Sequence, residues 1–166
     1  MKDRSFLRLC VISLLILASA CAPRMMQPIE KGHPGLTNRV LIASQEGPFK
    51  EAVVSEVADV LEQHGCYVRI IDVRQLSGLS TETYQAIVLV NTCKAWRLNR
   101  NVRTFLKKTQ DNEKVILLTT AGDKDWKPGH PEVDAITSAS AMDRTDDVAQ
   151  DIIRRVQTRL RQGQRS

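Results

Sequence analysis

Hydrophobic residues along this chain form short continuous runs that alternate with segments of helical periodicity. The first run, Val40 to Ala43, contains no polar residue, which is typical of a strand buried on both faces of a parallel sheet. Apolar residues then recur at helical spacing, opposite a polar side that includes Lys50 and Glu51, and Gly65 stands where this helix would end; they are Phe49, Val53, Val57, Val60 and Leu61. The order predicts the opening of an α/β fold, whose turn at 44–48 lies where such folds bind ligands.

The same reasoning predicts four more strands, at residues 67–73, 86–90, 114–120 and 133–138. The first of them has a mixed pattern that suits the edge of a sheet. Helices are predicted between them, and a final helix has Thr145 as N-cap and apolar residues at every fourth position from Val148 to Leu160. This alternation predicts a doubly wound, five-stranded parallel sheet with right-handed crossovers. The loop-like segment 121–132 is just long enough for the last crossover.

The N-terminal residues have the pattern of an export signal. Lys2, Arg4 and Arg8 precede an apolar run at 9–18 that is too short to span a bilayer, and small residues lead directly to Cys21. This resembles the lipobox of bacterial lipoproteins, in which the cysteine becomes the lipidated N-terminus, although Ala18 stands where Leu is most common. The alternative is a plain secretory signal.

The lipobox resemblance implies a division of the chain into a lipoprotein signal peptide at 1–20, a Pro- and Gly-rich flexible tether at 21–38, one domain at 39–162 and a tail at 163–166. It places the protein in the bacterial cell envelope, held by a lipid anchor and facing the periplasm. Ala22 is not acidic, which favours the outer membrane over the inner one.

The formal net charge is +5, and much of it comes from arginines in the last predicted helix. Such charges suit the C-terminal end of a helix dipole, and the alternative is contact with anionic lipid headgroups. Beyond charge, nothing in the sequence supports a nucleic-acid partner. Of the remaining cysteines, Cys66 precedes one strand and Cys93 follows another, so they lie at opposite ends of a parallel sheet and are expected to be free thiols.

The segment 84–108, YQAIVLVNTCKAWRLNRNVRTFLKK, resembles the flavodoxin-like fold, and most closely the short flavodoxin-domain proteins related to menaquinone-linked protoporphyrinogen dehydrogenases. The resemblance covers nearly all of residues 39–161. It implies a parallel sheet with strand order 2-1-3-4-5, an FMN cofactor and a role in electron transfer, with an envelope redox or structural protein as partner.

The turn after the first strand only partly matches the flavodoxin phosphate loop, which has the form [ST]-x-[ST]-G-x-[ST]. This chain has SQEGPF at 44–49, so that Ser44, Gln45 and Gly47 are the candidate ligands. Three changes oppose phosphate binding: the negative charge of Glu46, the missing N–H of Pro48 and the missing hydroxyl at Phe49.

The resemblance implies that two further turns at the same edge flank the flavin ring. Their candidate residues are Thr92, Cys93, Lys94 and Trp96 after the third strand, and Thr119, Thr120, Gly122 and Asp123 after the fourth. Trp96 or Trp126 could stack on a flat ring, and Lys94 or Arg97 could meet an anion. The alternatives are that both Trp are packing residues and that Cys93 is a small buried residue rather than a reactive thiol.

Two other features have a structural and a functional interpretation. Residues 134–140 resemble a motif at which some exported redox proteins carry covalent FMN, here on Ser140, but the fold requires its fifth strand at this place. His130 has acidic neighbours at no diagnostic metal-ligand spacing, which favours a solvated loop over a metal or acid–base site.

Two functions therefore compete. The first is a membrane-anchored flavodoxin-like domain that binds a flavin, or a similar flat ligand, for electron transfer through a degenerate phosphate loop. The second is a flavodoxin-like scaffold that has no cofactor and acts as a protein-interaction module. Catalysis by Cys93 or by the turn at Trp96 and Arg97 has the least support in the sequence.

Overall fold

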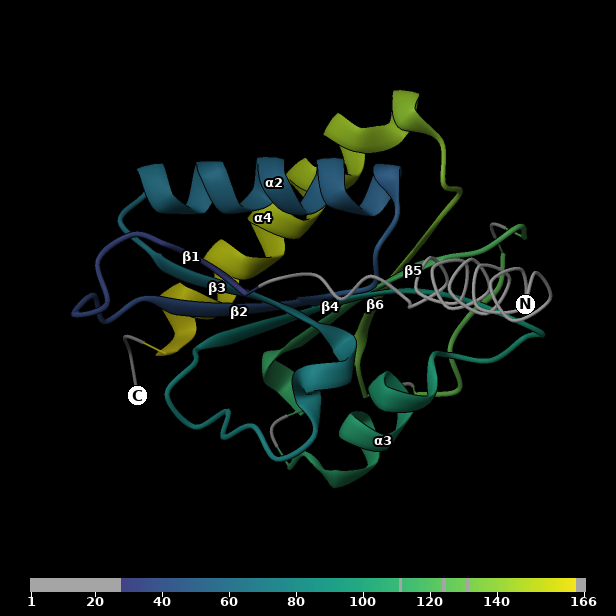
Figure 1. Ribbon diagram of the computed structural model, residues 1–166, viewed down its shortest axis with the longest axis horizontal. Coiled ribbons are helices and arrows are strands. Elements are labelled where there is room, and N and C mark those ends of the chain that lie inside the picture. Colours follow the sequence, from purple (N-terminus) through teal and green to yellow (C-terminus); the bar gives the residue numbers. More distant parts are fainter. Residues whose placement is uncertain (1–27, 111, 124, 131, 164–166) are drawn as a thin grey trace, which may run out of the picture.

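A computed structural model describes residues 28–110, 112–123, 125–130 and 132–163. In this part of the chain the central sheet has the order β1-β3-β2-β4-β5-β6 (Figure 1). Strands β2 to β6 are mutually parallel, and β1 is antiparallel to β3. Their bounds are β1 Ile29–Lys31, β2 Arg39–Ser44, β3 Tyr67–Asp72, β4 Ala86–Thr92, β5 Val115–Thr120 and β6 Asp134–Ser138.

The five parallel strands have the order expected from the sequence, 2-1-3-4-5. β2 pairs directly with β4, with Val40 opposite Ala86 and Ser44 opposite Val90. Parallel pairing brings the C-terminal ends of β2 to β6 to one side of the sheet, which we call the carboxyl edge. It is formed by Ser44, Asp72, Thr92, Thr120, Ser138 and the turns that follow them.

Helices cover both faces of the sheet (Figure 1). Helices α2, Pro48–Gln63, and α4, Thr145–Gly163, lie on one face, whereas α3, Arg100–Lys108, and the short 3-10 helix η2, Val73–Leu76, lie on the other. Two more 3-10 helices, η3 at Asn112–Lys114 and η4 at Met142–Arg144, precede β5 and α4. The described residues between β5 and β6 contain no helix.

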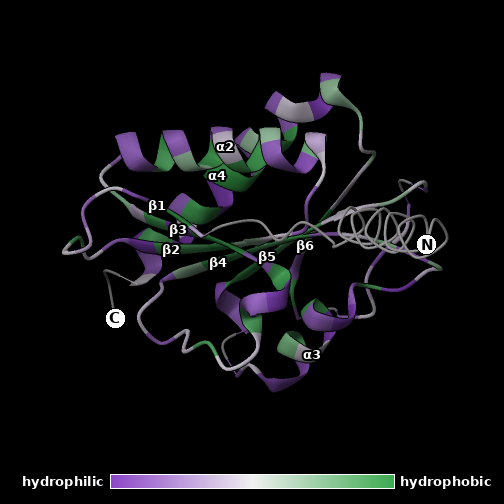
Figure 2. Cartoon of the chain, viewed as in Figure 1, coloured by the Kyte–Doolittle hydropathy of each residue, from purple (hydrophilic) through white to green (hydrophobic). Residues whose placement is uncertain are grey.

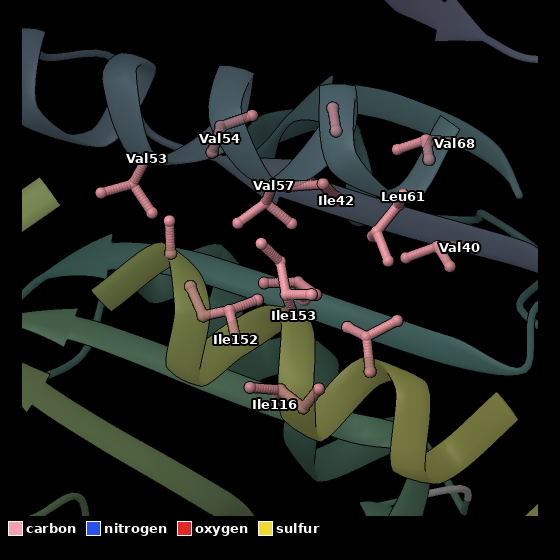
Figure 3. Packing of buried hydrophobic residues seen from close by; sticks show 14 of the residues in the cluster. Val40, Ile42, Val53, Val54, Val57, Leu61, Val68, Ile116, Ile152 and Ile153 are labelled. Carbon is pink, nitrogen blue, oxygen red and sulfur yellow. The ribbon is translucent and has the colours of Figure 1, made fainter. Parts of the chain in front are cut away.

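Each face of the sheet has its own hydrophobic core, which is why the central strands β2, β4 and β5 are mostly apolar (Figure 2). Val40 and Ile42 of β2 pack toward α2 and α4, where Val57 and Ile152 are almost fully buried (Figure 3). Leu41, the residue between them, packs in the second core with η2 and α3. Alternate residues of one strand therefore serve opposite cores.

The N-terminal strand is the main difference from the sequence expectation. Residues 29–31 lie within the expected tether, but they form β1, which pairs with β3. Lys31 forms an ion pair with Asp59 of α2, and the N–H of Gly32 donates to Glu62 Oε1 at 3.0 Å. Because β1 lies outside it, β3 is not the edge strand that its mixed pattern predicted.

Of two smaller expectations, the N-cap at Thr145 is wrong and the free thiols at Cys66 and Cys93 are confirmed. Thr145 is not an N-cap, because its hydroxyl donates to the carbonyl oxygen of Met142 at 2.8 Å and the residue itself begins α4. Cys66 and Cys93 are both free thiols, as expected, and burial raises the pKa of Cys66.

The predicted signal peptide, Cys21 and the tail residues 164–166 lie outside the described residues. Among the described helices, none combines the length and the apolar character that crossing a bilayer requires.

Candidate functional site

The carboxyl edge brings together the turns that follow β2, β4 and β5. Thr92 lies opposite Thr120, and Thr120 lies opposite Ser138 in the next strand. The N–H of Gln45 donates to the carbonyl oxygen of Val90 at 3.0 Å, so the first turn is fixed against the end of β4. Candidate residues from three separate turns are therefore neighbours.

Thr92 is the centre of a polar network at this edge. Its N–H donates to Gln45 Oε1 at 2.8 Å, and its Oγ1 accepts from Thr120 Oγ1 at 3.1 Å. The ammonium of Lys50, in the first turn of α2, also donates to Thr92 Oγ1 at 3.1 Å. The network joins β4, β5, the first turn and α2 in one rigid unit.

Within the first turn, the groups that would bind an anion are used by the chain itself. The hydroxyl of Ser44, a fully buried residue, donates to the carbonyl oxygen of Gln45 at 2.9 Å. The N–H of Gly47 donates to Glu51 Oε1 at 3.1 Å, and Pro48 has no N–H to offer. The carboxylate of Glu51 therefore accepts the hydrogen bond that an anion would accept at the start of α2.

Lys50 is a residue of this site that sequence reasoning missed. It was expected on the solvent side of α2, but only 8% of the residue is exposed. Its ammonium lies against Gly47, where an added Cβ would come within 2.9 Å of Nζ, and the φ of +139° at Gly47 also favours glycine. Burial lowers the pKa of Lys50, and the charge of Lys94 adds to this, whereas Glu51 and Glu46 oppose it.

The three residues that sequence reasoning named against phosphate binding have other roles. Glu46 is exposed, Pro48 begins α2, and Phe49 is buried in the core beneath α2. The turn is instead closed by the next two residues of the helix, Lys50 and Glu51. Their positions depend on how the first turn of α2 lies over the sheet, which helical periodicity does not encode.

The turn after β4 is a tight hairpin that projects from the carboxyl edge. The N–H of Lys94 donates to the carbonyl oxygen of Arg97, and that of Arg97 donates to the carbonyl oxygen of Lys94, both at 3.0 Å. The central residues, Ala95 and Trp96, have φ of +49° and +60°. Such turns usually use Asn or Gly at these two positions. Trp96 is 71% exposed at the tip.

The base of this hairpin is held firmly. Cys93, which is partly exposed, donates its N–H to the carbonyl oxygen of Thr120 at 2.8 Å. The buried side chain of Asn91 donates to Thr119 Oγ1 at 3.0 Å and accepts from the N–H of Asn99, the N-cap of α3, at 3.2 Å. Thr119 was a candidate ligand, but it is fully buried and its hydroxyl oxygen accepts a hydrogen bond inside the protein.

The other candidates after β5 lie further out. Gly122 and Asp123 are exposed, and Asp123 Oδ1 accepts from the N–H of Asp125 at 2.9 Å. Trp126 is half-buried against the core on the α3 side of the sheet, so packing explains its position. The two tryptophans therefore have different surroundings, and Trp96 is the exposed one.

The remaining sequence motifs have structural roles. Residues 134–138 form β6, and Asp134 pairs with Arg155 and with Arg159 of α4, the latter at 2.8 Å. This agrees with a strand rather than a cofactor motif. His130 Nδ1 lies 3.1 Å from Glu132 Oε1, and no group of metal-ligating side chains occurs among the described residues.

No protein-family model matches the chain, and no curated protein matches it either. Solved structures do match. An archaeal flavodoxin is 12% identical with a TM-score of 0.50, and a mutant flavodoxin from Pseudomonas aeruginosa is 12% identical with a TM-score of 0.51. Each match covers 72% of this chain and 99% of the other. The fold is flavodoxin-like.

A flavo di-iron protein mutant from Thermotoga maritima is similar over a single part of its length. It is 14% identical with a TM-score of 0.51, and the match covers 78% of this chain but 37% of that protein.

The residues of the first turn do not fit the phosphate of FMN. A phosphate there would need the N–H groups at the start of α2, and the N–H of Gly47 is already bonded to a carboxylate. A phosphate would also meet the negative charge of Glu51, and the buried hydroxyl of Ser44 donates within the turn. The carboxyl edge therefore has two parts: a polar network around Thr92 whose groups bond to one another, and an exposed basic hairpin that carries Trp96.

Proposed function

We propose that this protein is a lipoprotein of the bacterial envelope whose flavodoxin-like domain acts as an interaction module and does not carry FMN. The basic start, the short apolar run and the small residues before Cys21 support lipid anchoring. The surface that makes the contacts is the carboxyl edge, where flavodoxin-like folds have their ligand turns.

One observation carries the proposal: side chains of α2 close the first turn. The Lys50 ammonium is bonded to Thr92, and the Glu51 carboxylate is bonded to the N–H of Gly47. An FMN phosphate that accepted from the N–H of Gly47 would have to displace the Glu51 carboxylate. Displacing the carboxylate costs the hydrogen bond that stabilises the start of the helix, and the bound phosphate would then lie close to another negative charge.

A second candidate function, flavin-dependent electron transfer in the envelope, is supported by the charge near this turn. The positive charge of Lys94 contributes to the lowered pKa of Lys50, so two cations approach the same turn. Those cations could hold an anionic cofactor if Lys50 turned away from Thr92. Trp96 would then be the side chain available to stack on a flavin ring.

The spectrum of the intact protein purified from its membrane distinguishes the two functions. We expect a colourless protein, with no flavin absorbance and no flavin released on denaturation, because the closed turn offers no phosphate site. Because no flavin would be bound, Trp96→Phe should have the same visible absorption spectrum as the unsubstituted protein. A yellow protein that releases FMN in a near-stoichiometric amount would contradict the proposal and support the second candidate.

A further inference from the structure

The most exposed large hydrophobic residue in the described part of the chain is Trp96. It stands at the tip of the hairpin formed by residues 94–97, which two backbone hydrogen bonds close. Ala95 and Trp96 both have positive φ, a conformation that side chains with a Cβ adopt at a cost. Backbone strain of this kind, at an exposed aromatic residue that packs on no core, is typical of a contact site.

The hairpin is also basic on both sides of the tryptophan. Lys94 and Arg97 flank its tip and are exposed, and neither forms an ion pair within the described part of the chain. An indole ring between two free cations matches the headgroup region of a bilayer, where Trp is enriched and phosphates accept from Lys and Arg.

The path of the N-terminal segment brings the same edge toward the anchor. β1 runs antiparallel to β3, with Ile29 opposite Ile70 and Lys31 opposite Val68. The chain before Ile29 therefore lies toward the carboxyl end of β3, and Figure 1 shows β1 at the side of the sheet next to β3. The lipid-anchored end thus enters the domain from the side of the carboxyl edge.

The length of chain between Cys21 and β1 allows the hairpin to reach the membrane that would hold the lipid anchor. Six residues, 22–27, separate Cys21 from Pro28. Fully extended, they allow Cys21 to lie at most about 25 Å from Pro28. Three strand spacings, about 14 Å, separate β1 from β4, the strand that leads to the hairpin. A bilayer that holds the lipid on Cys21 is therefore within reach of Trp96.

We propose that the hairpin at residues 94–97 docks on the bilayer that holds the anchor, with Trp96 at the headgroup level and Lys94 and Arg97 on lipid phosphates. This names the partner of the carboxyl edge, and it rests on the proposed lipid anchor at Cys21. The anchor and the hairpin together hold the domain with its carboxyl edge facing the membrane.

The test uses the fluorescence of Trp96 in vesicles. Protein purified from the membrane of cells that express the whole chain is reconstituted in vesicles of phosphatidylglycerol and phosphatidylcholine. The phosphatidylcholine is brominated near the ester end of its acyl chains, so that the bromine quenches a tryptophan close to the headgroup level. The signal of Trp96 is obtained by subtracting the spectrum of Trp96→Phe, which leaves Trp126 as the only tryptophan. We expect a blue shift of the Trp96 emission and loss of most of its intensity.

Matched variants separate the hairpin from the anchor. Lys94→Glu with Arg97→Glu should still float with the vesicles but regain most of the Trp96 emission. Flotation of the unsubstituted protein with an unshifted, unquenched Trp96 would overturn the docking inference while leaving the anchor in place, and would assign the hairpin to a protein partner. Failure of the unsubstituted protein to float, or flotation that Cys21→Ser leaves unchanged, would overturn the anchor itself.

Discussion

Lys50 determines the chemistry of the carboxyl edge at the scale of single residues. Its stem and ammonium are buried at the start of α2, and Thr92 is its hydrogen-bond acceptor. A buried cation is costly unless an opposite charge or several acceptors compensate it. Glu51 and Glu46 compensate only in part, because the pKa of Lys50 remains below its ordinary value.

This arrangement predicts how stability depends on pH. Between the lowered folded-state pKa of Lys50 and 10.5, the unfolded chain binds more protons than the folded one, so the free energy of unfolding rises with pH in that window. Lys50→Met lacks this rise. At neutral pH we expect the free energy of unfolding of Lys50→Met to be higher than that of the unsubstituted protein by on the order of 1 kcal/mol. This difference should shrink at alkaline pH.

Urea unfolding followed by far-UV circular dichroism at several pH values measures this difference. The matched control is Lys107→Met, in α3, whose side chain is exposed and whose removal should leave the stability profile nearly unchanged. If Lys50→Met proved less stable at neutral pH, the buried ammonium would be a net stabilising group, in conflict with the direction of its pKa shift.

At the scale of elements, the turn after β1 explains how a three-residue strand is held. Gly32 has a φ of +78°, and an added Cβ there would overlap the carbonyl oxygen of Cys66. Its N–H also donates to Glu62 of α2. β1 therefore depends on a close backbone approach that only glycine permits.

Gly32→Ala should lower the free energy of unfolding by at least about 2 kcal/mol, because the positive φ and the steric overlap both oppose it. Gly78→Ala is the matched control: its φ is +80°, but an added Cβ would meet nothing within 4 Å. We expect a cost of about 1 kcal/mol there. Equal costs in urea unfolding would show that β1 does not pack closely against residues 66–67.

The hydrophobic pattern predicted the parallel elements well, because their apolar runs and helical spacing reflect burial directly. β1 carries no such signal. It is short and its surroundings in the sequence are rich in Pro and Gly. The ion pair of Lys31 with Asp59, and the hydrogen bond of the next residue with Glu62, join it to a helix that comes later in the chain. Pairing of this kind is set by tertiary contacts rather than by local preference.

At the scale of the whole molecule, the strand order made the meeting of the candidate turns predictable. Parallel strands end at one edge, and Gln45, Thr92 and Thr120 do form one network there. The roles of Lys50 and Thr119 were not predictable, because helical periodicity places a lysine on the solvent side and strand periodicity does not show which hydroxyls bond inward. The positive φ of Trp96 has no sequence signature either.

In this structure the side chains of α2 close the turn where a flavodoxin-like fold would hold the FMN phosphate. Titration of FMN with the intact protein, followed by quenching of flavin fluorescence, shows whether that turn can still accept the cofactor. We expect no saturable quenching by the unsubstituted protein. Saturable quenching at micromolar FMN would contradict this expectation. Its loss in Lys50→Met would in addition make Lys50 a phosphate ligand rather than a group that closes the turn.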